Sequence, residues 1–345
     1  MTHIKEKIIR QYSKYPGIVK GKDGKRLDIP LPGESEDVKG KITMFFPGGP
    51  FLFNFIDIKS QRIPDIIANP GETGHVLKIN YCETGRCELR LRNGECTYLT
   101  AGEIAVDAGQ ALNAFYYPTG EYRGFEIIVD LNRDSQEYRL FNERLSFPED
   151  IYKKCKEFKY PWIKNADEPV SRMYESCKFY VGKSDSSELV LLTCLEMIAF
   201  LSRMDFNKVS KRRTYCTISQ AEIAKRTKDI IMSDLSVRFT AKELAQKFGI
   251  SETSLKNYFR NVYGCGYSEY QHTQRMKEAA KLLKTTDKKI SDIGQLTGFA
   301  TQAKFGVAFK NYSGVTPMEY RRRNRLVDTA NAYVNERAVG RGIKK

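Results

Sequence analysis

The chain is poor in histidine, the residue on which many metal-dependent enzymes rely. Its 345 residues contain three histidines, at positions 3, 75 and 272, and one tryptophan. A metal-dependent barrel enzyme needs several histidine ligands and a carboxylate on neighbouring strands. This class is therefore disfavoured, and we expect no metal or other cofactor. The sequence also lacks a Gly-rich phosphate loop, a nucleophile elbow and a paired-carboxylate motif.

Long apolar runs and clustered thiols are missing too. No apolar stretch approaches the ~18 residues of a membrane helix, and the N-terminus MTHIKEKIIRQYSKYPG lacks the apolar core of an export signal. The eight cysteines are dispersed without a CxxC pair, which is typical of a reducing compartment. We expect a cytoplasmic protein without a membrane partner. A redox role for Cys82, Cys87 and Cys96 stays open.

Positive charge is in excess and unevenly distributed. The chain carries 57 Lys and Arg against 42 Asp and Glu, a net charge of +15. Residues 211–345 hold 27 basic and 12 acidic side chains, while residues 1–210 hold 30 of each. The whole excess lies in the C-terminal part, which indicates a polyanion, nucleic acid first, as the partner of that part.

The C-terminal part also contains a repeat. SETSLKNYFRNVYGCGYSEY begins at residue 251, and TQAKFGVAFKNYSGVTPMEY begins fifty residues later at residue 301. The residues identical at this offset are Phe259/Phe309, Asn261/Asn311, Gly264/Gly314, Glu269/Glu319 and Tyr270/Tyr320. Two copies are too few for a solenoid, so we interpret them as a duplicated small module.

Each copy has the pattern of a helix-turn-helix. In FTAKELAQKFGI, Thr240 and Glu243 have the spacing of a capping box, apolar residues follow at helical spacing, and Gly249 stands where the helix must end. Ser251 is then a cap for a second helix with an apolar inner face. The second copy, KISDIGQLTGFATQAKFGVAFKNYSG, repeats this order with one extra residue in the turn. A helix over roughly 268–286 joins the copies.

Residues 218–323 resemble the DNA-binding domain of the AraC/XylS family of transcription regulators. The resemblance is carried by Leu244, Ala245, Gly249, Ser251, Leu255, Phe259, Gly264, Glu269, Tyr270, Arg275, Ala279, Ala280, Leu282, Leu283, Ile290, Ile293, Gly298, Phe299, Phe305, Phe309, Lys310, Gly314, Thr316, Pro317, Tyr320 and Arg321. Gly294 departs from the pattern, which usually has alanine there. A glycine inside a helix costs roughly 1 kcal/mol relative to alanine, so we expect the second module to be the less stable one.

Each recognition helix, 251–263 and 301–313, is expected to enter a major groove of double-stranded promoter DNA. The expected DNA-contacting residues are Glu252, Thr253, Lys256, Asn257, Arg260 and Asn261 in the first module and Thr301, Gln302, Ala303, Lys304, Gly306 and Lys310 in the second. Asn and Arg can contact adenine and guanine edges through two hydrogen bonds, whereas Lys more often contacts phosphate. We therefore expect the second module to anchor the DNA backbone more than it selects bases.

Residues 41–131 have the pattern of β structure. Eight short segments with alternating, aromatic or β-branched character extend from KITMFF to EYRGFEIIVDL, and Gly or Asn-Gly turns separate several of them. This pattern predicts a sandwich or a barrel, and the family resemblance favours a cupin-like barrel. A small barrel can enclose a small-molecule effector. The aromatic residues expected to line such a pocket are Tyr81, Phe115, Tyr117, Tyr122 and Phe125.

Residues 148–204 have a helical pattern. SSELVLLTCLEMIAFLSRM is apolar over most of its circumference and contains a stripe made of Leu191, Leu195, Ile198 and Leu201. A helix of this kind must be buried, either under the barrel or against a second chain, and the resemblance favours the interface of a homodimer. We interpret DFNKVSKRRTYC, residues 205–216, as a flexible basic linker.

The sequence thus predicts an α+β multidomain protein. The expected order is an N-terminal arm (1–40), a β-barrel effector-binding domain (41–147), a helical dimerisation segment (148–204), the linker (205–216), an all-α domain with two helix-turn-helix modules (217–323) and a basic tail (324–345). The expected function is an effector-responsive transcription regulator and not an enzyme, and the resemblance adds RNA polymerase as a partner. Two alternatives are a regulator whose barrel binds a protein, and a cupin-type enzyme fused to a DNA-binding domain.

Overall fold

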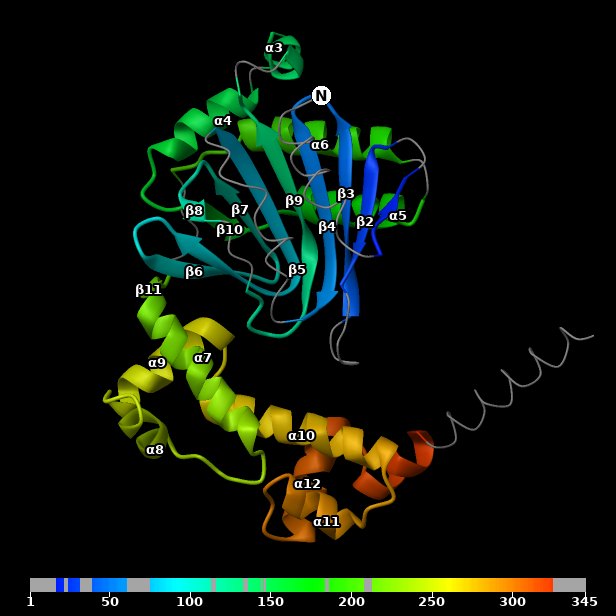
Figure 1. Ribbon diagram of the computed structural model, residues 1–345, viewed down its shortest axis with the longest axis vertical. Helices are drawn as coiled ribbons and strands as arrows, with labels where there is room; N and C mark the ends of the chain where they lie inside the picture. Colours follow the sequence, from blue (N-terminus) through cyan, green and yellow to red (C-terminus); the bar gives the residue numbers. More distant parts are fainter. Residues whose placement is uncertain are drawn as a thin grey trace, which may run out of the picture. The chain divides into compact units, whose positions relative to one another are not determined.

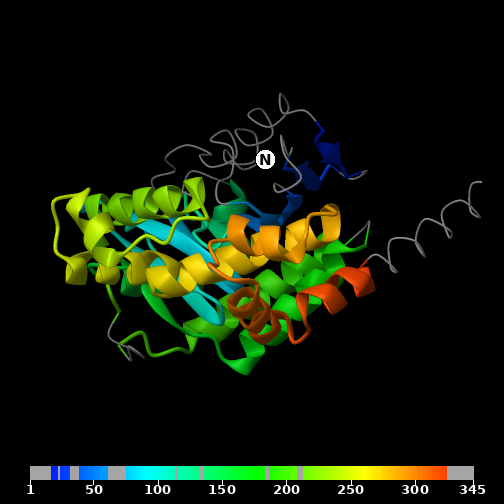
Figure 2. The same ribbon diagram turned by 90° about the horizontal axis from the view of Figure 1, so that it is seen from below.

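The protein consists of two compact units (Figure 1, Figure 2). The computed structural model describes residues 17–21, 24–31, 39–60, 75–112, 116–132, 136–143, 145, 147–183, 186–207 and 213–324. The units are Met1–Ser219 with Asn261–Tyr263, and Gln220–Arg260 with Gly264–Lys345. The predicted tail from residue 325 onward, and most of the predicted arm, lie outside the described residues.

An antiparallel sheet forms the first unit. Hydrogen-bonded neighbours follow the order β1 (Val19–Lys20), β2 (Arg26–Pro30), β3 (Lys39–Gly48), β4 (Phe51–Lys59), β9 (Tyr122–Asp130), β5 (Val76–Leu91), β6 (Glu95–Thr100) and β11 (Cys216–Thr217). Three strands branch from this path: β7 (Glu103–Asp107) and β8 (Ala111–Leu112) pair with β5, and β10 (Trp162–Asn165) pairs with β7. The prediction of a sheet-rich domain is confirmed. Among the described strands the first and last do not pair, so a closed barrel is not confirmed.

β5 pairs with more strands than any other described strand of the sheet: β9, β7, β6 and β8. It is 16 residues long, whereas the sequence pattern predicts two strands, HVLKINY and CELRLRN. Its register against β9 shifts between Cys82 and Thr84; earlier residues pair with β7, and later ones pair with β6 and β8. Gly85 is needed just after this shift, because a Cβ there would collide with the backbone oxygen of Glu121.

Helices cover one face of this sheet (Figure 1). They are α4 (Phe147–Lys156), α5 (Glu168–Val181) and α6 (Ser187–Ser202), and α3 (Gln136–Asn142) precedes them. Aromatic rings join the layers: Tyr174 of α5 stacks on Phe55 of β4 with centroids 5.6 Å apart and meets Tyr81 of β5 at 5.4 Å. The described residues of this unit include two clusters of buried apolar side chains. Because alternate strand residues point to opposite faces, β4 contributes Phe51, Phe53 and Phe55 to the cluster under the helices, and Leu52, Ile56 and Ile58 to the second cluster.

The predicted apolar stripe on α6 packs inside its own unit. Ile198 and Leu201 are 2% and 0% exposed, and they belong to the cluster under the helices. Leu191 and Leu195 are half-buried and pack against the same cluster. Of the two alternatives for this stripe, burial against the sheet therefore accounts for Ile198 and Leu201. These two side chains are not available to an interface with a second chain, which corrects that part of the dimerisation prediction.

The end of the predicted linker is bound to the first unit. Residues 208–212 lie outside the described part, but β11, which begins at Cys216, pairs with β6. Arg213 donates hydrogen bonds of 2.7 Å to the backbone oxygen of Tyr98 and to the carboxylate of Glu103. A strand of two residues has no periodicity, so the sequence pattern gave no sign of it. The hydrogen bonds of Arg213 and the pairing of β11 therefore attach this end of the predicted linker to the sheet.

The second unit is built from helices. They are α7 (Ile218–Ser233), α8 (Ala241–Gln246), α9 (Glu252–Tyr263), α10 (Tyr267–Thr285), α11 (Ile290–Leu296) and α12 (Gln302–Ser313), and residues 317–324 are also helical. The joining helix α10 has 19 residues and agrees with the predicted span to within one residue at each end. None of the described helices combines the length and the apolar character needed to cross a membrane.

The fifty-residue repeat reappears in the packing of this unit. Phe259 and Phe309 are both fully buried. Phe259 meets Tyr270 edge-on, with ring centroids 5.4 Å apart and planes at 70°, and Phe309 meets Tyr320 in the same way at 5.2 Å and 80°. Edge-to-face pairs of this kind stabilise beyond their buried area. The two modules therefore share one packing arrangement.

Gly294 of α11 lies against a ring of the next helix. A Cβ at this position would stand 3.2 Å from Cβ and 3.3 Å from Cγ of Phe305, closer than an ordinary van der Waals contact of 3.4–4 Å. In the first module the corresponding residues are Ala245 and the smaller Leu255. Glycine thus makes room for the larger side chain, and this packing offsets part of its unfavourable helix propensity.

Candidate nucleic-acid interface

The first module consists of α8, a turn and α9, and side chains fix the start of both helices. The Thr240 hydroxyl accepts a hydrogen bond from the Glu243 backbone N at 3.3 Å, and the Glu243 carboxylate accepts one from the Thr240 N at 2.8 Å. The predicted capping box is confirmed. Gly249 makes the turn with a φ of 64°. The Ser251 hydroxyl then accepts a hydrogen bond of 3.1 Å from the Ser254 N at the start of α9.

The second module has matching caps. The Thr301 hydroxyl accepts a hydrogen bond of 3.3 Å from the Lys304 N at the start of α12, after a turn at Gly298 with a φ of 79°. Both recognition helices are 12 residues long and end at a glycine with a φ of 78°, Gly264 in one and Gly314 in the other. Only glycine adopts this conformation without steric cost. The repeated residues are therefore those that define the ends and the core of each module.

The expected DNA-contacting side chains of α9 lie on the face opposite its core. Leu255 and Phe259 are fully buried, whereas Glu252, Thr253, Lys256, Asn257 and Arg260 are exposed and Asn261 is half-buried. The Lys256 ammonium and the Glu252 carboxylate are 3.4 Å apart on this outer face. An exposed pair of this spacing contributes only about 0.3–0.5 kcal/mol, so Lys256 can exchange Glu252 for a phosphate at little cost.

The expected residues of α12 are similarly placed. Thr301, Gln302, Ala303, Lys304 and Lys310 are exposed, and Gly306 is half-buried. Val307 is 63% exposed, and our sequence-based selection missed it. The sequence could have indicated Val307, because it stands four residues after Ala303 and this spacing puts both residues on one side of the helix. An apolar side chain on this side can contact the methyl group of thymine.

The residues expected to line an effector pocket occupy both faces of the sheet. Tyr81 and Phe125 are buried in the cluster under the helices, and Tyr117 and Tyr122 are buried in the second cluster. Phe115 lies outside the described residues. Strand alternation on β9 separates Tyr122 from Phe125, so the four described side chains do not converge as one group. A pocket lined by some of them stays a prediction.

The described residues include no group of three or more His, Cys, Asp and Glu side chains arranged to hold a metal ion. His75, the residue before β5, stacks on Tyr152 of α4 with ring centroids 4.4 Å apart. This contact gives the imidazole a packing role between the sheet and its helices.

Known proteins that are similar to the C-terminal part of the chain also contain helix-turn-helix domains. The model of a helix-turn-helix domain family matches residues 244–323. A protein of Proteus vulgaris named "Probable transcription factor PqrA" is 37% identical over 86 residues, which are 25% of this chain and 70% of that protein. The "HTH-type transcriptional activator AarP" of Providencia stuartii is 35% identical over 91 residues, 26% of this chain and 67% of that protein.

Solved structures align with a similar part of the chain. The C-terminal domain of AraT, a response regulator from Geobacillus stearothermophilus, is 30% identical and covers 29% of this chain and 84% of its own, with a TM-score of 0.29. The sequence matches to two transcription factors over two thirds or more of their length agree with the duplicated, capped helix-turn-helix modules. The chain therefore belongs to the AraC family of helix-turn-helix transcription regulators.

Proposed function

We propose that each chain reads two successive major grooves of promoter DNA through α9 and α12. The duplication carries this proposal: two helices of 12 residues have the same caps and aromatic cores, and both expose an outer face. The 19 residues of α10 join them. At 1.5 Å per residue α10 spans about 28 Å, and packing at its ends can extend this toward the roughly 34 Å of one DNA turn.

The two helices differ in the groups that they offer to DNA. Asn257 and Arg260 on α9 can each make two hydrogen bonds to a base edge, to adenine and guanine respectively. Lys304 and Lys310 on α12 are better suited to phosphates, and Val307 adds an apolar contact. We therefore propose that α9 selects most of the sequence, whereas α12 anchors the backbone and selects less.

Parallel selections of DNA sites from a random pool test this division. With Asn257→Ala, one position of the selected site should become degenerate, at a cost of about 1–3 kcal/mol or roughly 5- to 150-fold for the preferred base. With Lys304→Ala, binding should weaken on all sequences, and the slope of log affinity against log salt should fall by about one. Equal loss of base preference in both variants would contradict the proposed division.

We further propose that the first unit makes regulation depend on an effector. The supporting observation is that it is a separate compact unit with its own large core. An effector must bind one state of the regulator better than another, since equal affinity shifts nothing. In a thermal-shift screen, a ligand at 100 times its dissociation constant stabilises by about 2.7 kcal/mol. If only a protein partner shifts the melting temperature, the first unit is a protein-binding module.

We also propose a cytoplasmic homodimer that contacts RNA polymerase, as the family resemblance implies. On α6, Leu189 and Leu192 are 42% and 61% exposed and lie outside the intrachain core. Leu192→Glu should shift a dimer to a monomer in sedimentation velocity. A dimer that survives this change does not use this face of α6.

We propose a regulator rather than an enzyme. The two named relatives are transcription factors, and they align with about a quarter of the chain. Stoichiometric iron or zinc in the purified protein would instead favour a cupin-type enzyme fused to a DNA-binding domain.

A further inference from the structure

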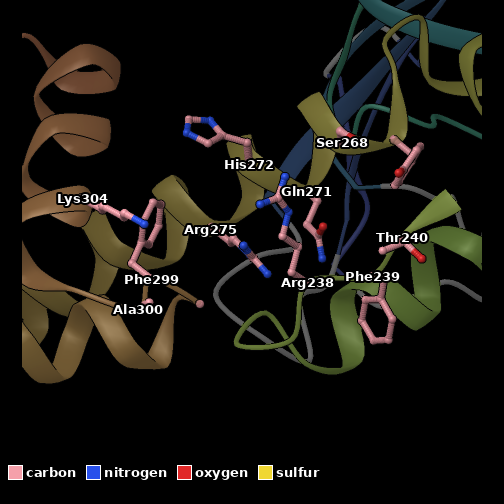
Figure 3. Close-up of a pocket in the computed structure, with 12 residues that line it drawn as sticks. Arg238, Phe239, Thr240, Ser268, Gln271, His272, Arg275, Phe299, Ala300 and Lys304 are labelled. Carbon is pink, nitrogen blue, oxygen red and sulfur yellow. The ribbon is translucent and has the colours of Figure 1, made fainter. Parts of the chain in front are cut away.

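A cavity of about 790 Å³ lies between the two modules of the second unit. Its walls come from residues 238–240 before α8, from one side of α10, and from the turn before α12 together with Lys304 (Figure 3). Sites for small molecules have volumes of about 300–1,000 Å³. The cavity is therefore large enough to hold more than a single inorganic ion.

The charged groups on these walls are cationic. Arg238, Arg275 and Lys304 line the cavity together with His272, and none of the described residues that line it is an Asp or a Glu (Figure 3). They come from three separate segments, so their convergence is a result of the fold and not of a local run of basic residues. Such a concentration of positive charge favours an anion.

Arg275 is the buried member of this group. Its side chain belongs to a residue that is 7% exposed, and its Nε and Nη2 atoms have no hydrogen-bond partner among the described residues. Burial lowers the pKa of this guanidinium, and the nearby charge of Arg238 lowers it further, while Asp234 acts in the opposite direction. A buried guanidinium beside a second cation is costly until an anion compensates it.

Asp234 is not among the residues that line the cavity. Its carboxylate accepts hydrogen bonds from the backbone N and the hydroxyl of Ser236, at 2.9 and 2.6 Å. The walls around Arg275 are held in place too: the buried Gln271 donates a hydrogen bond of 2.9 Å to the backbone oxygen of Val237. The positive charge is therefore pre-organised and lacks a carboxylate directed at it within the cavity lining.

Gly298 also lines the cavity and lies against the Arg275 side chain. A Cβ on this residue would stand 2.7 Å from Cζ of Arg275 and 2.8 Å from the backbone oxygen of Ser236. The turn before α12 thus approaches the guanidinium directly, and a larger residue would push it out of place. The glycine serves both the turn and the position of the charge.

We propose that this cavity binds a phosphate-class oxyanion. Guanidinium groups match phosphate oxygens in pairs, and the Lys304 ammonium adds a point charge. Phe239 and Phe299 are also among the residues that line the cavity, and apolar residues there suit the organic part of a phosphorylated molecule. The anion comes either from the DNA backbone, in which case the inference rests on the proposed function, or from a free phosphorylated compound, which would make the second unit itself responsive to a ligand.

The first experiment uses the full chain without DNA. Titration calorimetry with inorganic pyrophosphate at fixed ionic strength should show binding that Arg238→Gln weakens at least tenfold. Lys281→Gln is the matched control, because it removes one charge from an exposed position of α10 that does not line the cavity. This variant should bind like the unmodified chain. The result does not depend on DNA binding and so stands apart from the proposed function.

The second experiment measures affinity for DNA over a series of salt concentrations with the same variants. A backbone phosphate in the cavity predicts that the salt slope of Arg238→Gln is lower by about one than that of Lys281→Gln. Pyrophosphate binding without this difference identifies a free compound as the source, and the difference without pyrophosphate binding identifies DNA. If Arg238→Gln behaves like Lys281→Gln in both experiments, the proposal is wrong.

A second, independent inference concerns two cysteines that the sheet brings together. Cys96 of β6 stands directly opposite Cys216 of β11, both are buried, and their Sγ atoms are 3.2 Å apart. The thiols of Cys82 and Cys87 instead donate to backbone oxygens near them in sequence. β11 leads directly into α7, so a covalent link between these sulfurs would tie the chain to β6 at that point.

We infer that Cys96 and Cys216 form an oxidisable dithiol that reacts with a peroxide-class oxidant. One thiolate attacks a peroxide oxygen, and after protonation this gives a sulfenic acid and water; the other sulfur then displaces the sulfenic oxygen as water. Two thiols and one hydrogen peroxide thus give one disulfide and two waters, with two electrons passing to the peroxide. The hydrogen bond between the two thiols and burial both raise the pKa of Cys96, so little thiolate is present and the reaction is slow.

Peptide mapping of the full chain tests this inference. Hydrogen peroxide, followed by thiol blocking and digestion without reductant, should yield a linked pair of peptides that contain Cys96 and Cys216 and separate on addition of dithiothreitol. Cys216→Ser should abolish the link, and Cys82→Ser should leave it intact. Failure to form this link, or its persistence in Cys216→Ser, overturns the inference.

Discussion

Phe309→Ala tests whether the second module depends on its own small core. Phe309 is fully buried, and its ring lies 5.7 Å from Phe305 and 5.2 Å from Tyr320. Removing a buried phenylalanine costs about 3–5 kcal/mol, and losing an edge-to-face pair adds about 0.5–1.5 kcal/mol. These contributions overlap, so we expect a loss of about 4–5 kcal/mol. That is a large part of the roughly 5–15 kcal/mol that stabilises a domain.

The assay is hydrogen exchange and thermal melting of the full chain. Exchange should rise through α11 and α12, while the first unit keeps its protection because it has a separate core. Val307→Ala is the matched control, since Val307 lies on the same helix and is 63% exposed; it should change the free energy of unfolding by less than about 0.5 kcal/mol. If the two variants melt alike, the role assigned to this aromatic cluster is refuted.

Three further changes address the caps and the DNA-facing surface. Gly314→Ala places a Cβ in a left-handed conformation with a φ of 78°, so chemical denaturation should show a loss of about 1 kcal/mol or more; no loss would mean that the turn relaxes freely. Hydrogen bonds from the backbone N and the hydroxyl of Thr240 lower the pKa of Glu243, so its contribution to stability is present above its ordinary pKa of about 4.5 and lost as the pH falls through the lowered value. Below that pH, the protection of the α8 amides from hydrogen exchange, relative to an unfolded chain at the same pH, should fall more in the unmodified chain than in Thr240→Ala. Equal losses of protection would contradict the reasoning. Glu252→Gln removes the carboxylate 3.4 Å from Lys256, so affinity for DNA should rise a few-fold at low salt and less at high salt; a fall in affinity would show that Glu252 accepts a hydrogen bond from cytosine.

The ends and cores of the helix-turn-helix modules could be predicted from the sequence because they depend on neighbouring residues. Thr240 with Glu243, and Ser251, are local caps whose partners stand three residues away. Gly264 and Gly314 mark ends that require a left-handed conformation. The exposed faces of α9 and α12 then follow from helical periodicity.

The sheet was harder to predict because its details depend on distant pairings. Two predicted segments form the single strand β5, since only pairing with β9 on one side and β6 on the other shows where the strand bends. β11 has two residues, and its partner strand lies more than a hundred positions earlier in the chain. The four described aromatic residues that were grouped as a pocket separate onto two faces, because composition indicates burial but register decides the face.

The apolar stripe on α6 shows what helical periodicity cannot predict. Of the stripe made of Leu191, Leu195, Ile198 and Leu201, the last two are buried and the first two are half-buried. A periodic pattern says that a face is buried and does not say against what, and the sheet of the same chain covers Ile198 and Leu201. The convergence of Arg238 with Arg275 likewise arises from the packing of three segments and has no signature in any one of them.

Selection of DNA sites from a random pool by the full-length protein, at two salt concentrations, tests the central proposal most directly. Two reading helices on one chain predict enriched sites with two short elements about ten base pairs apart, still selected at the higher salt. Binding without enrichment, with affinity that collapses as salt rises, would mean that the protein contacts only the backbone, and reading by α9 and α12 would be contradicted.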